Sequence, residues 1–276
     1  MASGRRSLAG KAFLRLQRPL LKLAGFEWGL LPKAKRAFAR PWPVLLRYLE
    51  MKAVRDPWDV ALRGGSVLRI HTGDDLVCVW DCWVKEEYAL AGDEKVIVDA
   101  GANLGSFAFY ARHRAPAARI HALEPVGKTY GDLVHNIEAN RMQGSIIALK
   151  LGVAGRSGEA RISTGGSSPY SSLYGSPDGA GETIALRSLA DLLVEIGNPE
   201  CVDLIKLDCE GAEMDCLLHA DKAVLGRFRK ILFEYHTLSG FTYAALEAHL
   251  GAAGFRCEQV NHFPEFGTGV ARFSRS

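Results

Sequence analysis

Hydrophobic residues recur with two different periods along the 276-residue chain. Over residues 8–50, apolar side chains return at roughly helical spacing with basic residues between them. This region is punctuated by prolines, so we expect helices interrupted by turns. The period then changes, because residues 67–71 and 76–80 are short apolar runs on either side of a polar turn at 72–75. These two runs predict a short β pair.

From residue 95 onward, apolar runs rich in β-branched residues alternate with helix-length segments. The runs lie at 96–98, 119–123, 146–151, 203–207 and 230–233. Such alternation predicts an α/β fold, in which a parallel sheet is wound with helices. The interval 155–187 is rich in glycine and serine and breaks the alternation. We expect a hairpin followed by a long loop there, and loops of that length tend to be functional.

Composition excludes two classes of protein. The chain has 34 Lys and Arg, 31 Asp and Glu and 48% hydrophobic residues, which is typical of a globular protein and not of a disordered one. No apolar run approaches the ~20 residues that a membrane span needs. Basic residues interrupt the N-terminal apolar segment, which argues against a secretory signal. Six cysteines without a CxxC pair predict free thiols in a reducing compartment, so we expect a cytoplasmic protein.

Charge is distributed unevenly between the two ends of the chain. Residues 1–47 contain eleven basic residues and one acidic residue, a net charge of +10, whereas the remainder carries −7. Three interpretations of the basic segment stay open: a helical cap over a binding site, a surface that touches an anionic partner or a membrane, and an Arg-rich targeting peptide.

The first motif that carries chemistry is the run V-I-V-D-A-G-A-N-L-G at 96–105, followed by a predicted helix. A buried strand that ends in Asp99, then a turn with Gly101 and Gly105, is the layout of a nucleoside-cofactor site. A dehydrogenase would need G-x-G-x-x-G, but Asn103 stands where the middle glycine is expected. A tight turn without any ligand is the alternative.

The second motif is the strand end at 122–125, where Glu124 follows Gly105 by nineteen residues. A carboxylate at the end of the second strand is suited to bind both ribose hydroxyls of a nucleoside. Together the two motifs favour a nucleoside cofactor over a surface charge at Glu124.

The third motif, residues 202–213, is the most specific one. Its charged residues near the carboxyl end of a predicted buried strand are Lys206, Asp208, Glu210 and Glu213. The next strand brings Glu234 and His236 to the same edge, and period-two alternation puts both on one face. So many charges would be costly to bury for structure alone, so we expect a functional site.

In this order, these motifs resemble the FkbM family of S-adenosylmethionine-dependent methyltransferases. The resemblance runs from about residue 93 to 255 and is carried by residues 99–105, 123–125, 135–140, 203–213 and 233–236. It implies a class I methyltransferase fold, a Rossmann-like doubly wound sheet of seven strands whose last strand is antiparallel. It also implies S-adenosylmethionine as cofactor and O-methylation of a hydroxyl on a sugar or natural product.

The resemblance assigns roles to individual residues. Around the cofactor it places Asp99, Gly101, Ala102, Asn103, Gly105, Glu124, Pro125, Gly152, Val153 and Asp208. Gly152 and Val153 would end the third strand and border the adenine. Around the reacting hydroxyl it places His236, Asp208, Glu210 and Glu234. Ala190 stands where many members have aspartate, so the segment 187–193 receives no role.

Methyl transfer to a hydroxyl needs a base that takes the proton during attack. His236 is the first candidate, because an imidazole titrates near neutral pH, and Asp208 is the second. A purely structural histidine is the alternative. Asp208, Glu210 and Glu234 could instead bind a divalent cation, although we do not predict a metal.

The expected organisation is a basic, mainly helical segment at 1–58, acting as cap or partner-binding segment, and a methyltransferase domain at 59–276 with core motifs at 95–255. The expected partner is a small-molecule hydroxyl acceptor, and homo-oligomers stay open. A catalytically silent scaffold of the same fold is one alternative. A nucleic-acid methyltransferase docking through the basic segment is another, but the chain lacks an Asn/Asp-Pro-Pro-Tyr/Phe motif and its catalytic part is acidic. We therefore expect no nucleic-acid partner.

Overall fold

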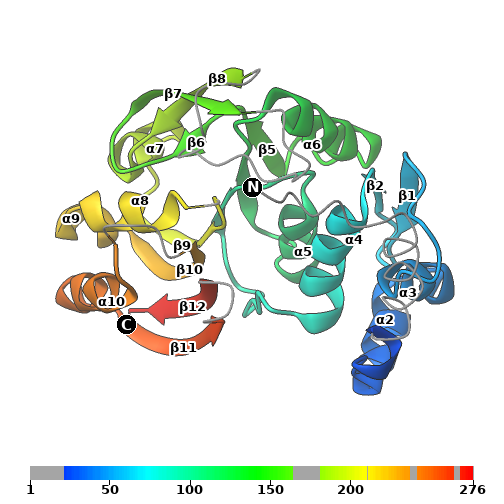
Figure 1. Cartoon of the computed structure of the whole chain (residues 1–276). Coiled ribbons are helices and arrows are strands. Elements are labelled where there is room, and N and C mark those ends of the chain that lie inside the picture. The colour runs from blue at the N-terminus through cyan, green and yellow to red at the C-terminus, as the bar shows by residue number, and fades with distance from the viewer. Residues whose placement is uncertain (1–21, 164–180, 210, 237–240, 264–267, 276) are drawn as a thin grey trace, which may run out of the picture. The chain divides into compact units, whose positions relative to one another are not determined.

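The chain forms two compact units, residues 1–87 and 88–276, which are considered one at a time. The computed structural model describes residues 22–163, 181–209, 211–236, 241–263 and 268–275 (Figure 1). Predictions for residues 1–21, which hold five of the eleven basic residues of the N-terminal segment, therefore lie outside the described residues. Residues 59–87, which the sequence interpretation assigns to the second domain, belong to the first unit.

The first unit combines short helices with one hairpin. Its elements are η1 (Trp28–Leu30), α2 (Leu31–Ala37), α3 (Pro41–Tyr48), β1 (Trp58–Ala61), β2 (Val67–Ile70), α4 (Gly73–Trp80) and η2 (Asp81–Lys85). The indole of Trp80 is fully buried and stacks on the ring of Tyr48, with 4.2 Å between centroids and an interplanar angle of 13°. The ring of Phe38 also stacks on Trp80, with 6.1 Å between centroids. These aromatic contacts give the unit a hydrophobic core of its own.

The predicted β pair at 67–71 and 76–80 is wrong in its second half. Residues 73–80 form the helix α4, and β2 pairs instead with β1 in an antiparallel hairpin. The cause is local: the Thr72 side chain accepts a hydrogen bond from the backbone N–H of Asp75, and the Asp75 side chain accepts one from the N–H of Thr72. This capping box starts a helix where the apolar run alone favours a strand.

Replacing Thr72 by alanine should lower the free energy of unfolding by about 1 kcal/mol, because the backbone N–H of Asp75 loses its acceptor. Urea denaturation measures this change. Val67→Ala, at an exposed position on β2, is the control and should change stability less. Equal effects of both substitutions would contradict the capping role.

The second unit is built on a seven-stranded sheet with the strand order β11–β12–β10–β9–β3–β4–β5 (Figure 1). Its strands are β3 (Val96–Ala100), β4 (Arg119–Leu123), β5 (Ile146–Leu149), β9 (Val202–Leu207), β10 (Phe228–His236), β11 (Arg256–Phe263) and β12 (Thr268–Ser274). Its helices are α5 (Ser106–Arg114), α6 (Gly127–Ala139), α7 (Leu189–Glu195), α8 (Glu213–His219), α9 (Lys222–Leu225) and α10 (Tyr243–Ala252). The last strand, β12, is antiparallel to both neighbours, which confirms the predicted doubly wound sheet with a reversed final strand.

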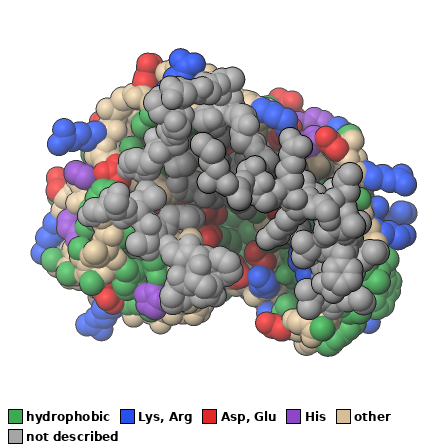
Figure 2. Space-filling view, viewed as in Figure 1, with side chains coloured by type: hydrophobic (Ala, Val, Ile, Leu, Met, Phe, Trp, Pro, Cys, Tyr) green, Lys and Arg blue, Asp and Glu red, His purple; other side chains and the backbone are tan. Residues whose placement is uncertain are grey.

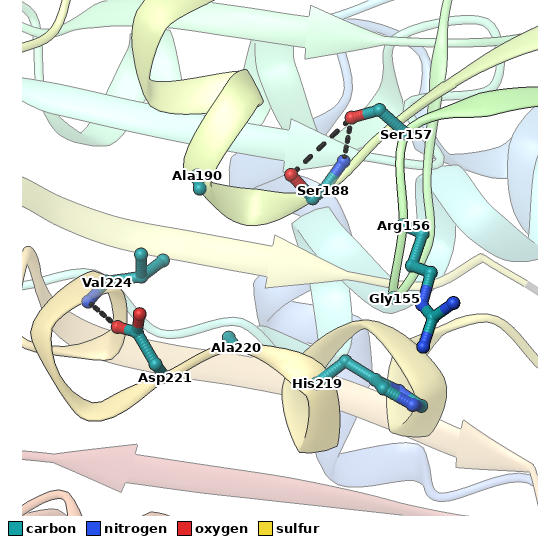
Figure 3. Close-up of a pocket in the computed structure, with 9 residues that line it drawn as sticks. All are labelled: Gly155, Arg156, Ser157, Ser188, Ala190, His219, Ala220, Asp221 and Val224. Atoms are coloured by element: carbon teal, nitrogen blue, oxygen red, sulfur yellow. Dashed lines mark hydrogen bonds between the residues drawn. The ribbon is translucent and has the colours of Figure 1, made fainter.

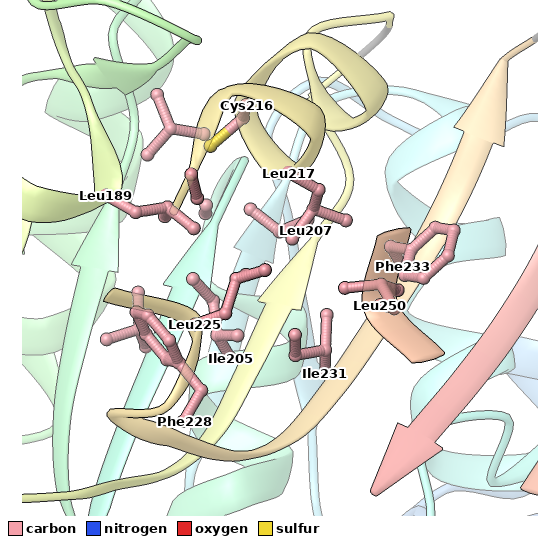
Figure 4. Packing of buried hydrophobic residues seen from close by; sticks show 14 of the residues in the cluster. Leu189, Ile205, Leu207, Cys216, Leu217, Leu225, Phe228, Ile231, Phe233 and Leu250 are labelled. Atoms are coloured by element: carbon pink, nitrogen blue, oxygen red, sulfur yellow. The ribbon is translucent and has the colours of Figure 1, made fainter. Parts of the chain in front are cut away.

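Alternation along the central strands separates an apolar face from a charged one. Ile205 and Leu207 of β9 and Phe233 of β10 pack with Leu217 of α8 and Leu250 of α10 in one buried cluster (Figure 4). Residues between them point to the other face, since successive side chains of a strand alternate. Lys206, between Ile205 and Leu207, therefore projects away from this core.

A second, smaller sheet contains β6 (Gly152–Val153), β7 (Gly158–Ser163) and β8 (Gly181–Arg187), in the order β6–β8–β7. Two predictions are corrected here. The third strand of the large sheet ends at Leu149, so 152–153 is a separate strand that pairs with β8. In addition, β7 and β8 pair antiparallel across residues 164–180, so that interval lies between the two strands of the hairpin and does not follow it.

The sequence composition also makes predictions about membrane spans and disulfides. In the described part of the chain, no helix has both the length and the hydropathy to cross a membrane. All six cysteines lie in that part and none forms a disulfide, as the sequence predicts. On the face drawn in Figure 2, basic and acidic side chains of the described residues are interspersed, without a continuous basic stripe.

Candidate active site

Sheet register brings the charged residues of two motifs side by side. Asp99 of β3 pairs with Lys206 of β9, and Lys206 in turn pairs with Leu232 of β10. Two residues further along, Asp208 and Glu234 follow on the same face, because strand side chains repeat with period two. Both strands end here at the carboxyl edge, where doubly wound sheets hold their ligands. The register therefore confirms that these motifs meet.

The buried carboxylate of Asp99 lies next to a buried ammonium group. Asp99 is fully buried, and its carboxylate lies 3.3 Å from Nζ of Lys206, which is also buried. Burial raises the pKa of Asp99, and the nearby Lys206 opposes that rise. The ammonium is thus the main compensation for a carboxylate that water does not reach.

The turn after β3 is packed directly against the segment after β9. Gly101 has a φ of 75°, and a Cβ on it would lie 1.8 Å from the backbone oxygen of Asp208. The N–H groups of Gly101 and Ala102 donate to the carbonyl of Leu123, at 3.0 and 2.9 Å. Only glycine fits at 101, since a side chain would meet backbone atoms. The first two motifs are therefore joined by backbone contacts.

Gly101→Ala should destabilise the fold by about 3 kcal/mol or more, because the clash with the Asp208 carbonyl and the positive φ act together. Gly131→Ala is the matched control: Gly131 lies inside α6 with open space around it, so alanine should stabilise by up to about 1 kcal/mol. Thermal unfolding of both variants tests this. A folded Gly101→Ala protein of wild-type stability would contradict the packing described.

One residue that holds this turn was missed in the sequence. Asn136 on α6 is buried, and its amide donates a hydrogen bond of 3.0 Å to the carbonyl of Leu104. Gly105 then caps α5 with a φ of 102°. Asn136 falls inside the motif at 135–140, but nothing in the local pattern shows that its side chain reaches back to residue 104.

Glu124 lies at the end of β4 and is buried, with 6% of its surface exposed. One carboxylate oxygen accepts a hydrogen bond from the N–H of Asn103 at 3.0 Å, and the other from the N–H of Val126 at 2.9 Å. Burial raises the pKa of Glu124 to about 7, against the lowering effect of these two bonds. A carboxylate has about four lone-pair sites, so each oxygen keeps one for a further donor. A vicinal diol, such as ribose, fits this arrangement.

Gly152 and Val153 are buried and lie beside the strand end that carries Glu124. A Cβ on Gly152 would come within 3.5 Å of the Pro125 ring. They thus lie near the predicted cofactor residues, although they belong to β6 and not to the third strand. Their predicted contact with adenine stays a prediction.

Glu213 shapes the segment that follows β9. Its side chain is fully buried, and its carboxylate accepts hydrogen bonds from the backbone N–H of Cys209 and, at 2.9 Å, from that of Gly211. Glu213 therefore holds the turn on both sides of position 210. The sequence shows the charge of Glu213 but not this role. Residue 210 lies outside the described residues, so the site prediction for Glu210 is not tested.

The residues that the sequence predicts around the acceptor belong to β10 and to the segment that follows β9. Asp208 has 27% of its side chain exposed, and Glu234 is half-buried. His236 ends β10, where its backbone pairs with Thr268 of β12; its side chain is outside the described part. Among described residues, no three His, Cys, Asp or Glu side chains gather as a metal site. The cation alternative includes Glu210 and is therefore not tested.

A separate hollow of about 330 Å³ lies away from these residues (Figure 3). Its lining residues come from the loop after β6, the start of α7 and the junction of α8 and α9: Gly155, Arg156, Ser157, Ser188, Ala190, His219, Ala220, Asp221 and Val224. The Ser157 hydroxyl accepts a hydrogen bond of 2.9 Å from the N–H of Ser188 there. None of the predicted site residues lines this hollow.

A doubly wound sheet with a tight glycine turn after its first strand and a buried carboxylate after its second defines an α/β protein suited to bind a nucleoside. The family described as Methyltransferase FkbM domain matches residues 99–257, more than half of the chain. The chain belongs to this family, as the sequence motifs indicated.

Two curated relatives are similar over the same region. The methyltransferase sdnD of Sordaria araneosa is 30% identical over 192 residues, covering 58% of this chain and 73% of the relative. The AMB antimetabolite synthetase AmbE of Pseudomonas aeruginosa is 28% identical over 214 residues, covering 63% of this chain but only 10% of the synthetase. Among solved structures, M. capricolum TrmK in complex with S-adenosyl-homocysteine aligns with a TM-score of 0.43 and 10% identity, over 68% of this chain and 65% of that one.

Proposed function

We propose that the protein catalyses S-adenosylmethionine-dependent O-methylation of a hydroxyl group on a sugar or natural-product small molecule. The observation that carries the proposal is Glu124, a buried carboxylate with one free acceptor site on each oxygen at the end of β4. Membership in the FkbM family supports methyl transfer. The cytoplasm, where thiols stay reduced, is the proposed location, in keeping with cysteines that form no disulfide.

The cofactor would be held at several points along the carboxyl edge. Glu124 would accept hydrogen bonds from the two ribose hydroxyls, while the turn at 101–105 would approach the methionine end. Pro125, Gly152 and Val153 would border the adenine. When bound, S-adenosylmethionine supplies an electrophilic methyl group on a positively charged sulfur. The residues of the chain orient the two reactants, and alignment is worth up to ~7–11 kcal/mol in favourable cases.

The acceptor would lie over the ends of β9 and β10. There a base takes the hydroxyl proton as the oxygen attacks, because an alcohol is too weak an acid to ionise at neutral pH. His236 is the proposed base and Asp208 the second candidate, with Glu210 and Glu234 orienting the acceptor. This division leaves Asp99 and Lys206 below the site, buried away from the acceptor.

The first test is a thermal-shift comparison of S-adenosylmethionine and NADH. A ligand at 100 times its dissociation constant stabilises the folded state by about 2.7 kcal/mol, so the correct cofactor should raise Tm. Mass spectrometry across a panel of glycosides, polyketides and peptides then detects the gain of one methyl group. Acceptors with the reactive hydroxyl removed are the controls. A shift with NADH alone would refute the cofactor, and transfer to nitrogen would refute O-methylation.

A further inference from the structure

Lys206 is a buried cation beneath the proposed site. Only 5% of its side chain is exposed, and its Nζ lies 5.8 Å from the ring centroid of Tyr88 and 6.0 Å from that of Phe107. The sequence interpretation gives it no contact with cofactor or acceptor. A desolvated ammonium is costly unless oxygen atoms surround it, so its partners explain why it is there.

Oxygen atoms of three residues lie close to Nζ of Lys206. They are the backbone oxygen of Gly101 at 3.0 Å, Oδ1 of Asp99 at 3.3 Å and Oδ2 of Asp208 at 3.3 Å. The Gly101 oxygen accepts a hydrogen bond from the ammonium, and the two carboxylates lie at ion-pair distance from it. These oxygens come from three places: the end of β3, the turn that follows β3 and the segment that follows β9. The Lys206 side chain thus contacts both the turn after β3 and the segment after β9.

Backbone contacts make this junction stiff. The N–H of Asp208 donates to the carbonyl of Ala100 at 3.1 Å, and Gly101 lies against the backbone oxygen of Asp208. The turn and the segment after β9 are in direct backbone contact, because not even a Cβ fits between Gly101 and the Asp208 carbonyl. The Lys206 contacts therefore set where the Asp208 carboxylate points relative to that turn.

We propose that Lys206 is a positioning residue for methyl transfer, whose three contacts fix the Asp208 carboxylate relative to the turn that holds the cofactor. The proposal rests on the proposed function, since it assumes that the turn at 101–105 binds S-adenosylmethionine and that Asp208 faces the acceptor. Lys206 itself acts through Gly101 and Asp208 and does not touch the acceptor.

Two substitutions of Lys206 distinguish a role in positioning the Asp208 carboxylate from a role as the countercharge of Asp99. Lys206→Arg keeps the positive charge beside Asp99, but a planar guanidinium cannot place its N–H groups on the same three oxygens. Lys206→Met removes the charge and every contact. The matched control is Lys230→Met, because Lys230 also projects from a strand toward a buried carboxylate, Glu94, at 3.5 Å.

The measurements are kcat and KM for the best acceptor of the panel, the dissociation constant of S-adenosylmethionine, and hydrogen exchange of peptides 100–105 and 207–213. Lys206→Arg should fold and bind the cofactor within about threefold of wild type, but its kcat should fall at least about 10-fold. The kcat of Lys206→Met should fall about 100-fold, as expected for reactants misplaced by about 1 Å. Exchange should rise in both peptides together. Lys230→Met should keep kcat and the exchange of both peptides.

Two results overturn the proposal. One is a wild-type kcat for Lys206→Arg, which would reduce Lys206 to a countercharge. The other is unchanged exchange of both peptides in Lys206→Arg, and this readout needs no acceptor and does not depend on whether Lys206→Met folds. If wild-type protein methylates no acceptor, the proposed function fails, while the exchange comparison still decides whether Lys206 holds the two segments together.

Discussion

Replacing Glu124 by glutamine is expected to weaken S-adenosylmethionine binding by about 100-fold at pH 8. The reason is that two ribose hydroxyls lose a charged acceptor, and each hydrogen bond to a charged group is worth about 1.5–3 kcal/mol. Isothermal titration calorimetry measures the dissociation constant directly. Glu138→Gln, an exposed glutamate on α6, is the control and should bind as wild type does.

The pH dependence of binding gives a second signature of Glu124. Because its pKa is raised to about 7 by burial, the carboxylate becomes protonated as the pH falls below 7. Cofactor affinity of the wild type should then fall by up to tenfold per pH unit between pH 7 and pH 5, and stay level above pH 8. In Glu124→Gln this dependence should be absent. Equal pH profiles for both proteins would refute Glu124 as the ribose ligand.

Stability without cofactor should change in the opposite direction. The folded protein holds the Glu124 proton up to about pH 7, while an unfolded glutamate releases it near its ordinary value of 4.5. Between these values the folded state binds more protons, so rising pH lowers the free energy of unfolding, by about 3 kcal/mol in total. The difference between wild type and Glu124→Gln across this range isolates the contribution. The same carboxylate thus favours binding and opposes folding at pH 8.

His236→Ala is expected to reduce kcat by about 10²–10⁴, the usual contribution of a general base, while S-adenosylmethionine binds within about threefold of wild type. The binding prediction follows because His236 lies at the end of β10, whereas Glu124 lies at the end of β4, three strands away in the sheet order. Steady-state kinetics and calorimetry on the same preparation measure the two quantities.

The control for this substitution is His113→Ala, because His113 is exposed in the last turn of α5. It should retain wild-type kcat. If His236→Ala is fully active, the base assignment passes to Asp208, and Asp208→Asn should then abolish turnover. A large loss of cofactor affinity in His236→Ala would instead show that the histidine supports the fold of the edge.

Local sequence patterns predicted the parts of this protein that depend on local geometry. Apolar, β-branched runs predict buried strands, and the carboxyl ends of parallel strands lie at one edge of the sheet. The positions of Asp99, Glu124 and Asp208 at that edge therefore follow from the sequence alone. The wrong strand prediction at 76–80 also comes from a local pattern. Five apolar residues suit either a helix or a strand, and the side-chain hydrogen bonds of Thr72 and Asp75 decide between them.

What only the tertiary structure decided is which distant atoms touch. Strand order and register set the neighbours of a residue, and no local period encodes either. The contacts of Lys206 with Asp99 and Gly101, across more than a hundred residues, depend on β9 lying beside β3 in one register. The turn held by Glu213 depends likewise on how α8 begins. The sequence by itself determined that these charges meet at one edge; folding decided which of them face a ligand and which hold the others in place.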